Sequence, residues 1–203
     1  MNYEAQMEEE ARRWKHKQLR KPSLLERSSK KAQVKINNLI PEKVHQTITE
    51  SIKKMVQATL IGSNITTFPK KIENHTFEER EMLVKKSLET FKKTAAIEGA
   101  STGAGGLLLG LADFPLFLSI KMKFLFEVAS SYGNNTKEYE ERLFLLYVFQ
   151  LAFSSETHKE ETLEKIENWE TKKHEVKDLD WRIFQQEYRD YIDLVKLMQI
   201  LPG

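Results

Sequence analysis

Apolar residues recur along this chain at the three- and four-residue spacing of amphipathic helices, and no segment alternates as a half-buried strand would. A narrow apolar stripe predicts a first helix that ends before Pro22, formed by Tyr3, Met7, Ala11 and Trp14. A second helix is expected from about Ser23 until Pro41 stops it. A third helix, closed near Gly62, is marked by Val44, Ile48, Ile52, Met55 and Val56.

Residues 63–75, with Pro69 inside, are predicted to form a long loop. The sequence Thr76-Phe77-Glu78-Glu79 has the spacing of a capping box, which starts a helix by satisfying backbone N–H groups at both ends of the box. A fourth helix is therefore predicted after Thr76, with one apolar face made of Phe77, Val84, Leu88, Phe91 and Ala95.

The next segment is rich in glycine and almost free of charge. From Gly99 to Ile120 the only charged residue is Asp113, and five of the eight glycines lie there. The pairs Gly99/Gly103 and Gly106/Gly110 have the four-residue spacing that lets helix backbones approach closely. Asp113 is a preferred N-cap, and Phe114-Pro115 suits a first helical turn. We expect that helix to run through Phe124 and Val128 to Gly133.

Three further helical segments follow. An N-cap-like sequence, Asn135-Thr136-Lys137-Glu138, leads into Leu143 to Phe153, which is apolar on every side except at Gln150 and should be the most buried helix. Residues 156–177 are acidic and lysine-rich and predict a solvated helix or helix pair. The last is an amphipathic helix over 180–200. Its aromatic stripe is expected to pack against the other helices and support them, and it contains Trp181, Phe184, Tyr188 and Tyr191.

These segments predict an all-α fold, a single bundle of about seven to eight helices with a Gly-rich apolar helical hairpin. One helical domain covers residues 1–203 in this interpretation. Its parts are basic N-terminal helices over 1–40, the hairpin over 95–133, a buried central helix over 136–153 and the amphipathic C-terminal helix.

Charge is distributed unevenly along the chain, although 32 basic and 30 acidic residues nearly balance overall. The region from Arg12 to Lys35 contains Glu26 as its only acidic residue. Such a segment favours an anionic surface, either lipid or nucleic acid, although a solvated helix face paired with Glu8, Glu9 and Glu10, or with the acidic half of the chain, explains it equally well. The candidate anion-binding residues are Arg12, Arg13, Lys15, Lys17, Arg20, Lys21, Lys30 and Lys31.

Composition excludes several classes of protein. With no cysteine, thiol chemistry, disulfides and Cys-ligated metals are excluded. No apolar stretch follows Met1, so we expect no secretory signal peptide and a cytoplasmic location. No helix-turn-helix spacing accompanies the basic residues, and nucleic-acid binding is not expected.

Motifs for catalysis and metal binding are incomplete. Gly99-Ala100-Ser101-Thr102-Gly103 matches G-x-S-x-G, but a helix rather than a strand precedes it. Leu111 and Ala112 replace the Lys and Ser/Thr of a phosphate loop. Glu42 and His45 form one Glu-x-x-His without the second pair that a di-iron bundle needs. We therefore predict no catalytic residues, no metal and no cofactor.

The Gly-rich segment has two interpretations. The apolar stretch from Gly99 to Ala112 is shorter than the roughly 20 residues of a spanning helix. It either forms a close-packed crossing inside a bundle, or dips into one leaflet together with 114–126 while the basic N-terminal region holds the headgroups. The candidate membrane or partner docking residues are Gly99, Gly103, Gly106, Gly110, Asp113, Phe114, Pro115 and Phe117.

The chain resembles the EcsC family of bacterial proteins. The resemblance covers most of the chain and is carried by the spaced glycines of 99–132 with Asp113-Phe114-Pro115 and by the sequence from Trp181 to Tyr191. The family is named for a third gene beside the ATPase and membrane subunits of an ABC exporter and has no agreed activity or catalytic residues. The resemblance implies an accessory protein at the cytoplasmic face of the membrane. Family members usually continue after Pro202-Gly203 into a second small-residue segment and a further helix.

We therefore expect a non-enzymatic accessory protein, peripherally attached to the inner face of the cell membrane, whose partners are anionic lipids and ABC transporter subunits. A soluble bundle that binds an apolar ligand such as an acyl chain is the alternative. The third hypothesis is an enzyme that uses Asp113 with Glu127 or Glu187.

Overall fold

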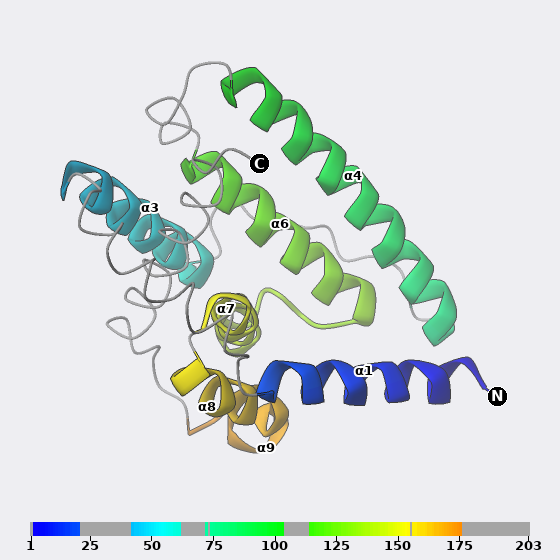
Figure 1. Ribbon diagram of the computed structural model, residues 1–203. Coiled ribbons are helices and arrows are strands. Elements are labelled where there is room, and N and C mark those ends of the chain that lie inside the picture. The colour runs from blue at the N-terminus through cyan, green and yellow to red at the C-terminus, as the bar shows by residue number, and fades with distance from the viewer. Residues whose placement is uncertain are drawn as a thin grey trace. The chain divides into compact units, whose positions relative to one another are not determined.

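A computed structural model of the chain describes residues 2–20, 42–61, 72, 74–103, 114–154 and 156–175. Seven helices and no strand lie within these ranges, which confirms the all-α class (Figure 1). They are α1 (Tyr3–Leu19), α3 (Glu42–Ile61), α4 (Phe77–Gly103), α6 (Phe114–Tyr132), α7 (Tyr139–Phe153), α8 (Glu156–Glu167) and α9 (Trp169–Lys172). The helices predicted over 23–41 and 180–200 lie outside the described residues, as does most of the predicted 63–75 loop.

The chain divides into two compact units. The first consists of residues 1–7 and 50–146, and it contains α4 and α6 whole. The second consists of residues 8–49 and 147–203, and it contains α8 and α9 whole.

The capping box predicted at the start of α4 is present. The backbone N–H of Thr76 donates to Oε2 of Glu79 at 2.7 Å, and the backbone N–H of Glu79 donates to Oγ1 of Thr76 at 3.3 Å. The hydrogen bonds from Thr76 lower the pKa of Glu79. Two N–H groups that the helix itself leaves unpaired thus gain acceptors, which fixes where α4 begins.

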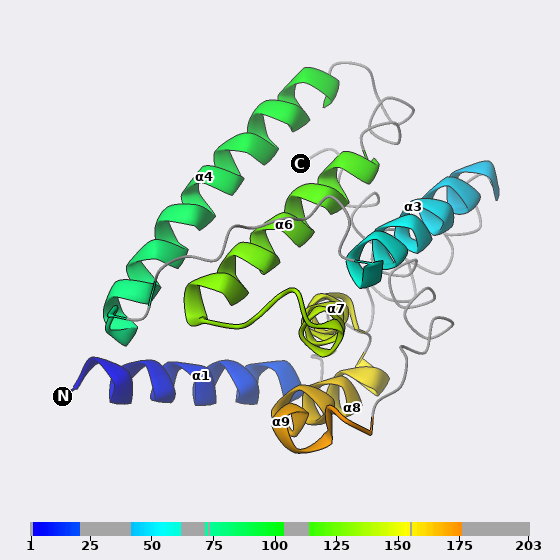
Figure 2. The ribbon, with the colours of Figure 1, turned by 180° about the vertical axis from the view of Figure 1, so that it is seen from behind.

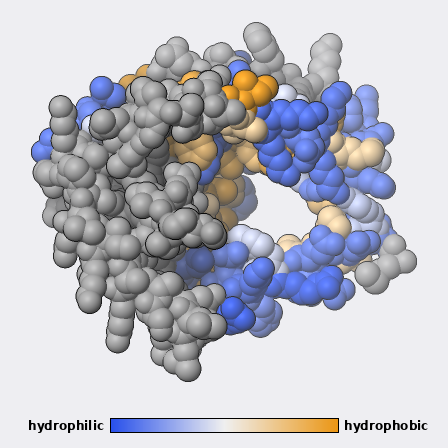
Figure 3. Space-filling view, turned by 45° about the horizontal axis from the view of Figure 1, so that its top comes forward, coloured by the Kyte–Doolittle hydropathy of each residue, from blue (hydrophilic) through white to orange (hydrophobic). Residues whose placement is uncertain are grey.

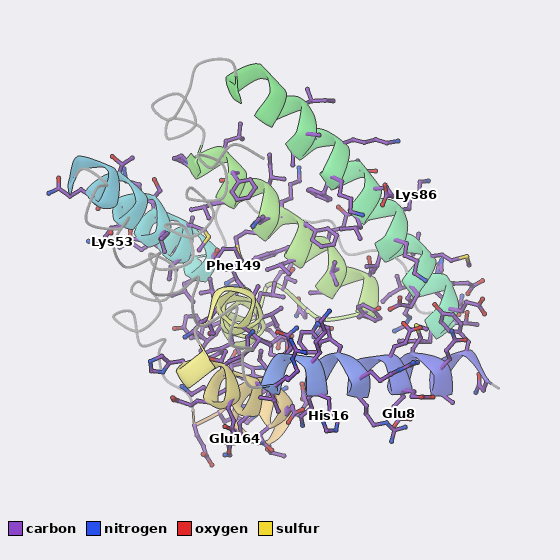
Figure 4. All side chains as sticks on the ribbon, in the orientation of Figure 1. Glu8, His16, Lys53, Lys86, Phe149 and Glu164 are labelled. Carbon is purple, nitrogen blue, oxygen red and sulfur yellow. The ribbon has the colours of Figure 1, made fainter. Side chains whose placement is uncertain are left out.

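Helices α4 and α6 pack against each other in the first unit (Figures 1 and 2). Tyr132 donates to Glu81, the Ser87 hydroxyl donates to Oε1 of Glu127 at 2.6 Å, and the rings of Phe91 and Phe124 lie 5.5 Å apart between centroids. As the α4 residue number rises, the α6 number falls, so the two helices are antiparallel. Lys86, labelled in Figure 4, projects from the other side of α4 and is exposed.

Helix α6 also buries a second face. Its fully or almost fully buried residues recur at helical spacing and are Leu118, Met122, Phe126 and Ala129. The second half of α6 is enclosed, because no residue from Phe124 to Tyr132 is exposed, whereas most of α4 is exposed on the side away from α6.

The polar end of the α4–α6 pair is the end that contains Arg80 and Tyr132. The Arg80 guanidinium donates to the carbonyls of His75 at 3.2 Å and Tyr132 at 3.1 Å. Gly133 stops α6 as predicted, with a φ of 98°, and an added Cβ would lie 3.2 Å from Cδ1 of Ile72. Glycine suits this position because other residues rarely adopt a positive φ.

Among the described helices, α7 contains the largest share of the buried apolar residues, in line with the sequence prediction. The buried residues are Leu143, Leu145, Leu146, Tyr147, Phe149 (labelled in Figure 4) and Leu151. In the first unit, Nε of Arg142 donates to the carbonyl of Leu60 at 3.0 Å, which places a cation at the C-terminal end of α3.

The second unit confirms a helix pair over residues 156–172, and it contains one burial that the sequence did not reveal. Trp169 opens α9 and is 3% exposed, with its ring 5.8 Å from that of Tyr147. The acidic and lysine-rich character of 156–177 predicts only solvated faces. Trp169 shows that this segment also contributes to an apolar interior.

Replacing Thr76 by Ala should lower the free energy of unfolding by about 1 kcal/mol, because the N-cap hydrogen bond to the Glu79 N–H is lost. Urea unfolding followed by circular dichroism measures this change. Thr90→Ala is the matched control: Thr90 is exposed in the middle of α4 and its hydroxyl bonds only the Lys86 carbonyl one turn back. Equal destabilisation by both variants would contradict the role of the capping box.

Candidate docking site at one end of the α4–α6 pair

The end opposite the polar end is apolar and exposed. Figures 1 and 2 both show that α4 ends beside the point where α6 begins. Ile97 is 71% exposed, Leu116 is 44% exposed and Phe117 is 41% exposed. The register of the pair places Ile97 at the level of Phe117. We call this end of the helix pair, which contains the exposed residues Ile97, Leu116 and Phe117, the apolar end.

One charged side chain lies directly behind the apolar end. Nζ of Lys121 lies 4.3 Å from the centroid of the Phe117 ring, a cation–π distance, and the Lys121 side chain is half-buried. Burial lowers the pKa of Lys121 to about 8 from its ordinary value of 10.5. The lowered pKa means that the protein holds this ammonium group at a desolvation cost.

The other charged side chains that the structure describes near the apolar end are exposed and mostly positive. Lys93 and Lys123 are exposed, and Lys92 forms an ion pair with Glu89 at 3.0 Å. Figure 3 shows that the described surface is largely hydrophilic in that view, with hydrophobic residues exposed at its upper edge. An apolar surface bordered by cations is the combination that attracts amphipathic anionic partners.

The predicted docking residues lie at this end only in part. Pro115 and Phe117 are exposed in the first turn of α6, and Phe114 begins that helix. Helix α4 continues through Gly99 to Gly103, beyond the boundary that the sequence suggested at residue 95. The predicted residues Gly106, Gly110 and Asp113 lie outside the described residues.

The cations of α1 have acidic partners. Arg12 pairs with Glu8 at 3.7 Å and Arg13 pairs with Glu9 at 3.9 Å. In the second unit, Lys15 pairs with Glu167 at 2.6 Å. Helix α1 contains four glutamates and four Lys or Arg residues, so its formal charge is zero with histidine neutral. Arg12, Arg13 and Lys15 therefore fit the interpretation in which the basic residues lie on a solvated helix face and pair with acidic residues.

The apolar stripe predicted on α1 makes few packing contacts in the described structure. No residue of α1 is buried, and Trp14 is 49% exposed. Tyr3, in the first unit, lies 6.2 Å from Phe77 between ring centroids. The cations Lys17 and Arg20 are exposed, whereas Lys21, Lys30 and Lys31 lie outside the described residues, as do the support residues Trp181, Phe184, Tyr188 and Tyr191.

The carboxylates that the enzyme hypothesis requires are not brought together within the described chain. Glu127 accepts the hydrogen bond from Ser87, which is a structural link between α4 and α6. Asp113 and Glu187 lie outside the described residues. Among the described residues, no group of three or more His, Asp or Glu side chains is arranged to hold a metal ion. In the same residues, no helix combines the length and apolar character needed to cross a bilayer.

Sequence reasoning missed Ile97 and Lys121. Ile97 lies on the exposed side of α4, and only the α4–α6 register shows that it shares a level with Phe117. Lys121 follows Phe117 by four residues, which is a detectable helical spacing. Its partial burial depends on how α6 is enclosed, which the sequence pattern alone does not specify.

Comparison with known proteins places the chain in a family. The EcsC protein family matches residues 5–203, and the chain belongs to that family. It is 55% identical to "Protein EcsC" of Bacillus subtilis (strain 168), covering 96% of this chain and 81% of that protein. It is 27% identical to "Uncharacterized protein YdbA" of the same organism, covering 82% of this chain and 70% of that protein. No solved structure matches the chain.

Replacing Lys121 by Met should raise the free energy of unfolding by about 1–2 kcal/mol at pH 7, because the half-buried ammonium group is costly. Below pH 8 both folded and unfolded states carry the charge, so the cost is fully present. Between pH 8 and 10.5 the folded state releases the proton first, and the cost diminishes. The gain from Lys121→Met should therefore be smaller at pH 10.

Urea unfolding at both pH values measures this gain, with Lys123→Met as the exposed control two residues away. The control should change stability little at either pH. A pH-independent gain for Lys121→Met would contradict the burial of the charged group.

Proposed function

We propose that this EcsC-family protein is a non-enzymatic accessory protein attached peripherally to the cytoplasmic face of the cell membrane. It acts through contact with lipid or with a membrane-protein partner, for which the subunits of an ABC exporter are the candidates. The attachment is made by the apolar end of the α4–α6 pair and by basic residues near it and in the N-terminal region.

The observation that carries this proposal is that Ile97, Leu116 and Phe117 are each exposed and all lie toward the same end of the helix pair. Large apolar side chains scattered singly on a surface are normal, but a group of them marks a contact surface. The Gly-rich stretch of the sequence continues from α4 at this end. Small residues and exposed large apolar residues are thus adjacent along the chain.

Electrostatic attraction supplies the second part of the attachment. Lys93 and Lys123 are exposed near the apolar end, although α4 as a whole contains five glutamates and five Lys or Arg residues and is formally neutral, as α1 is. A short apolar surface and a few cations each bind a bilayer weakly, and together they give stable attachment. The contribution of α1 itself is smaller than its sequence suggests, because Arg12, Arg13 and Lys15 have acidic partners.

Flotation of the full-length protein with vesicles of phosphatidylglycerol and phosphatidylcholine tests the attachment. Phe117→Ser should lower the partition coefficient about fivefold, because the apolar area available for insertion is reduced. Phe117 is already partly exposed, so the fold should survive the change.

Met82→Ser is the matched control for this experiment. Met82 is a large apolar residue of α4 that is 56% exposed, and it lies toward the polar end of the pair, near Glu81 and Arg80. Its substitution should leave vesicle binding unchanged. Absence of binding by the wild-type protein, or equal loss in both variants, would refute attachment through the apolar end.

A further inference from the structure

We propose that Lys121 and the Phe117 ring together form a binding site for the phosphate group of an anionic phospholipid in the bilayer. This inference rests on the proposed membrane attachment and identifies the residue that recognises the lipid headgroup. Nζ of Lys121 lies 4.3 Å from the centroid of the exposed Phe117 ring, one helical turn from the start of the exposed apolar surface.

The geometry of α6 sets the depth of the two side chains. Four residues separate Phe117 from Lys121, which is about 6 Å along a helix axis. Helical side chains lean toward the N-terminus of their helix, and in α6 that direction is the apolar end. An apolar face that enters the boundary of headgroups and acyl chains by about 5–10 Å therefore brings the Lys121 ammonium group to the level of the phosphates.

Partial burial makes Lys121 different from its neighbours. Lys93 and Lys123 are exposed, so water already solvates their ammonium groups fully. Lys121 has lost part of its hydration, as its lowered pKa indicates. Less water must be removed when a phosphate approaches, and the long aliphatic part of the side chain remains against the apolar surface.

The surrounding charges favour a lipid with net negative charge. Of the described charged side chains near this end, Lys92, Lys93 and Lys123 are positive, and Glu89 is negative and paired with Lys92. A zwitterionic headgroup would place its own ammonium group among these cations. The phosphate of phosphatidylglycerol has no such counter-charge, so electrostatics select the anionic lipid.

Flotation of the full-length protein with phosphatidylglycerol and with phosphatidylcholine vesicles tests the site through the ratio of the two partition coefficients. Lys121→Gln should lower this ratio about fivefold, the effect of one lysine near an anionic surface. Lys121→Arg should keep most of it, because the charge and reach remain. Lys123→Gln removes the same charge from an exposed position two residues away and should change the ratio less than twofold.

Each outcome has a separate meaning. Wild-type binding to neither vesicle would refute the proposed attachment as a whole. Wild-type binding with equal ratios for Lys121→Gln and Lys123→Gln would overturn the phosphate site while leaving the attachment intact. Release of the protein from the vesicles by inorganic phosphate, at equal phosphate concentration and constant ionic strength, would also overturn a site that belongs to the bilayer. Circular dichroism of each variant confirms that the helices are retained.

Discussion

The antiparallel packing of α4 against α6 is the contact on which the account depends. Links between Glu81 and Tyr132, between Ser87 and Glu127, and between Phe91 and Phe124 fix its register. Helix α6 is also buried on a second face, which includes Leu118, Met122 and Phe126. Arg80, Glu81 and Tyr132 form hydrogen bonds at the polar end, and the opposite end exposes Ile97, Leu116 and Phe117.

This asymmetry links stability to function. Arg80, Gly133 and the Thr76 capping box make the polar end rigid through specific hydrogen bonds and one backbone conformation that requires glycine. The apolar end has exposed large side chains and a half-buried lysine, each of which is unfavourable in water. The proposed attachment to a bilayer with anionic lipids would offset both costs.

The sequence predicted local features more reliably than contacts between distant residues. The capping box, the start of α6 after Asp113, the Gly133 stop and the burial of α7 each follow from residues within a few positions of one another. Arg80 contacts the Tyr132 carbonyl, 52 residues away, and Trp169 packs against Tyr147 from a segment that reads as solvated. These contacts, and the ion pair between Lys15 and Glu167, depend on which surfaces meet in the fold, whereas the pairs of Arg12 with Glu8 and Arg13 with Glu9 are local to α1.

Hydrogen–deuterium exchange of the full-length protein, with and without phosphatidylglycerol vesicles, tests the central claim most directly. Attachment through the apolar end predicts that vesicles slow amide exchange in the last turns of α4 and the first turns of α6, around Ile97 and Phe117. Exchange around Arg80 and Tyr132 should stay unchanged. Protection at the polar end instead, or no protection in either helix when the protein is bound, would contradict attachment through the apolar end.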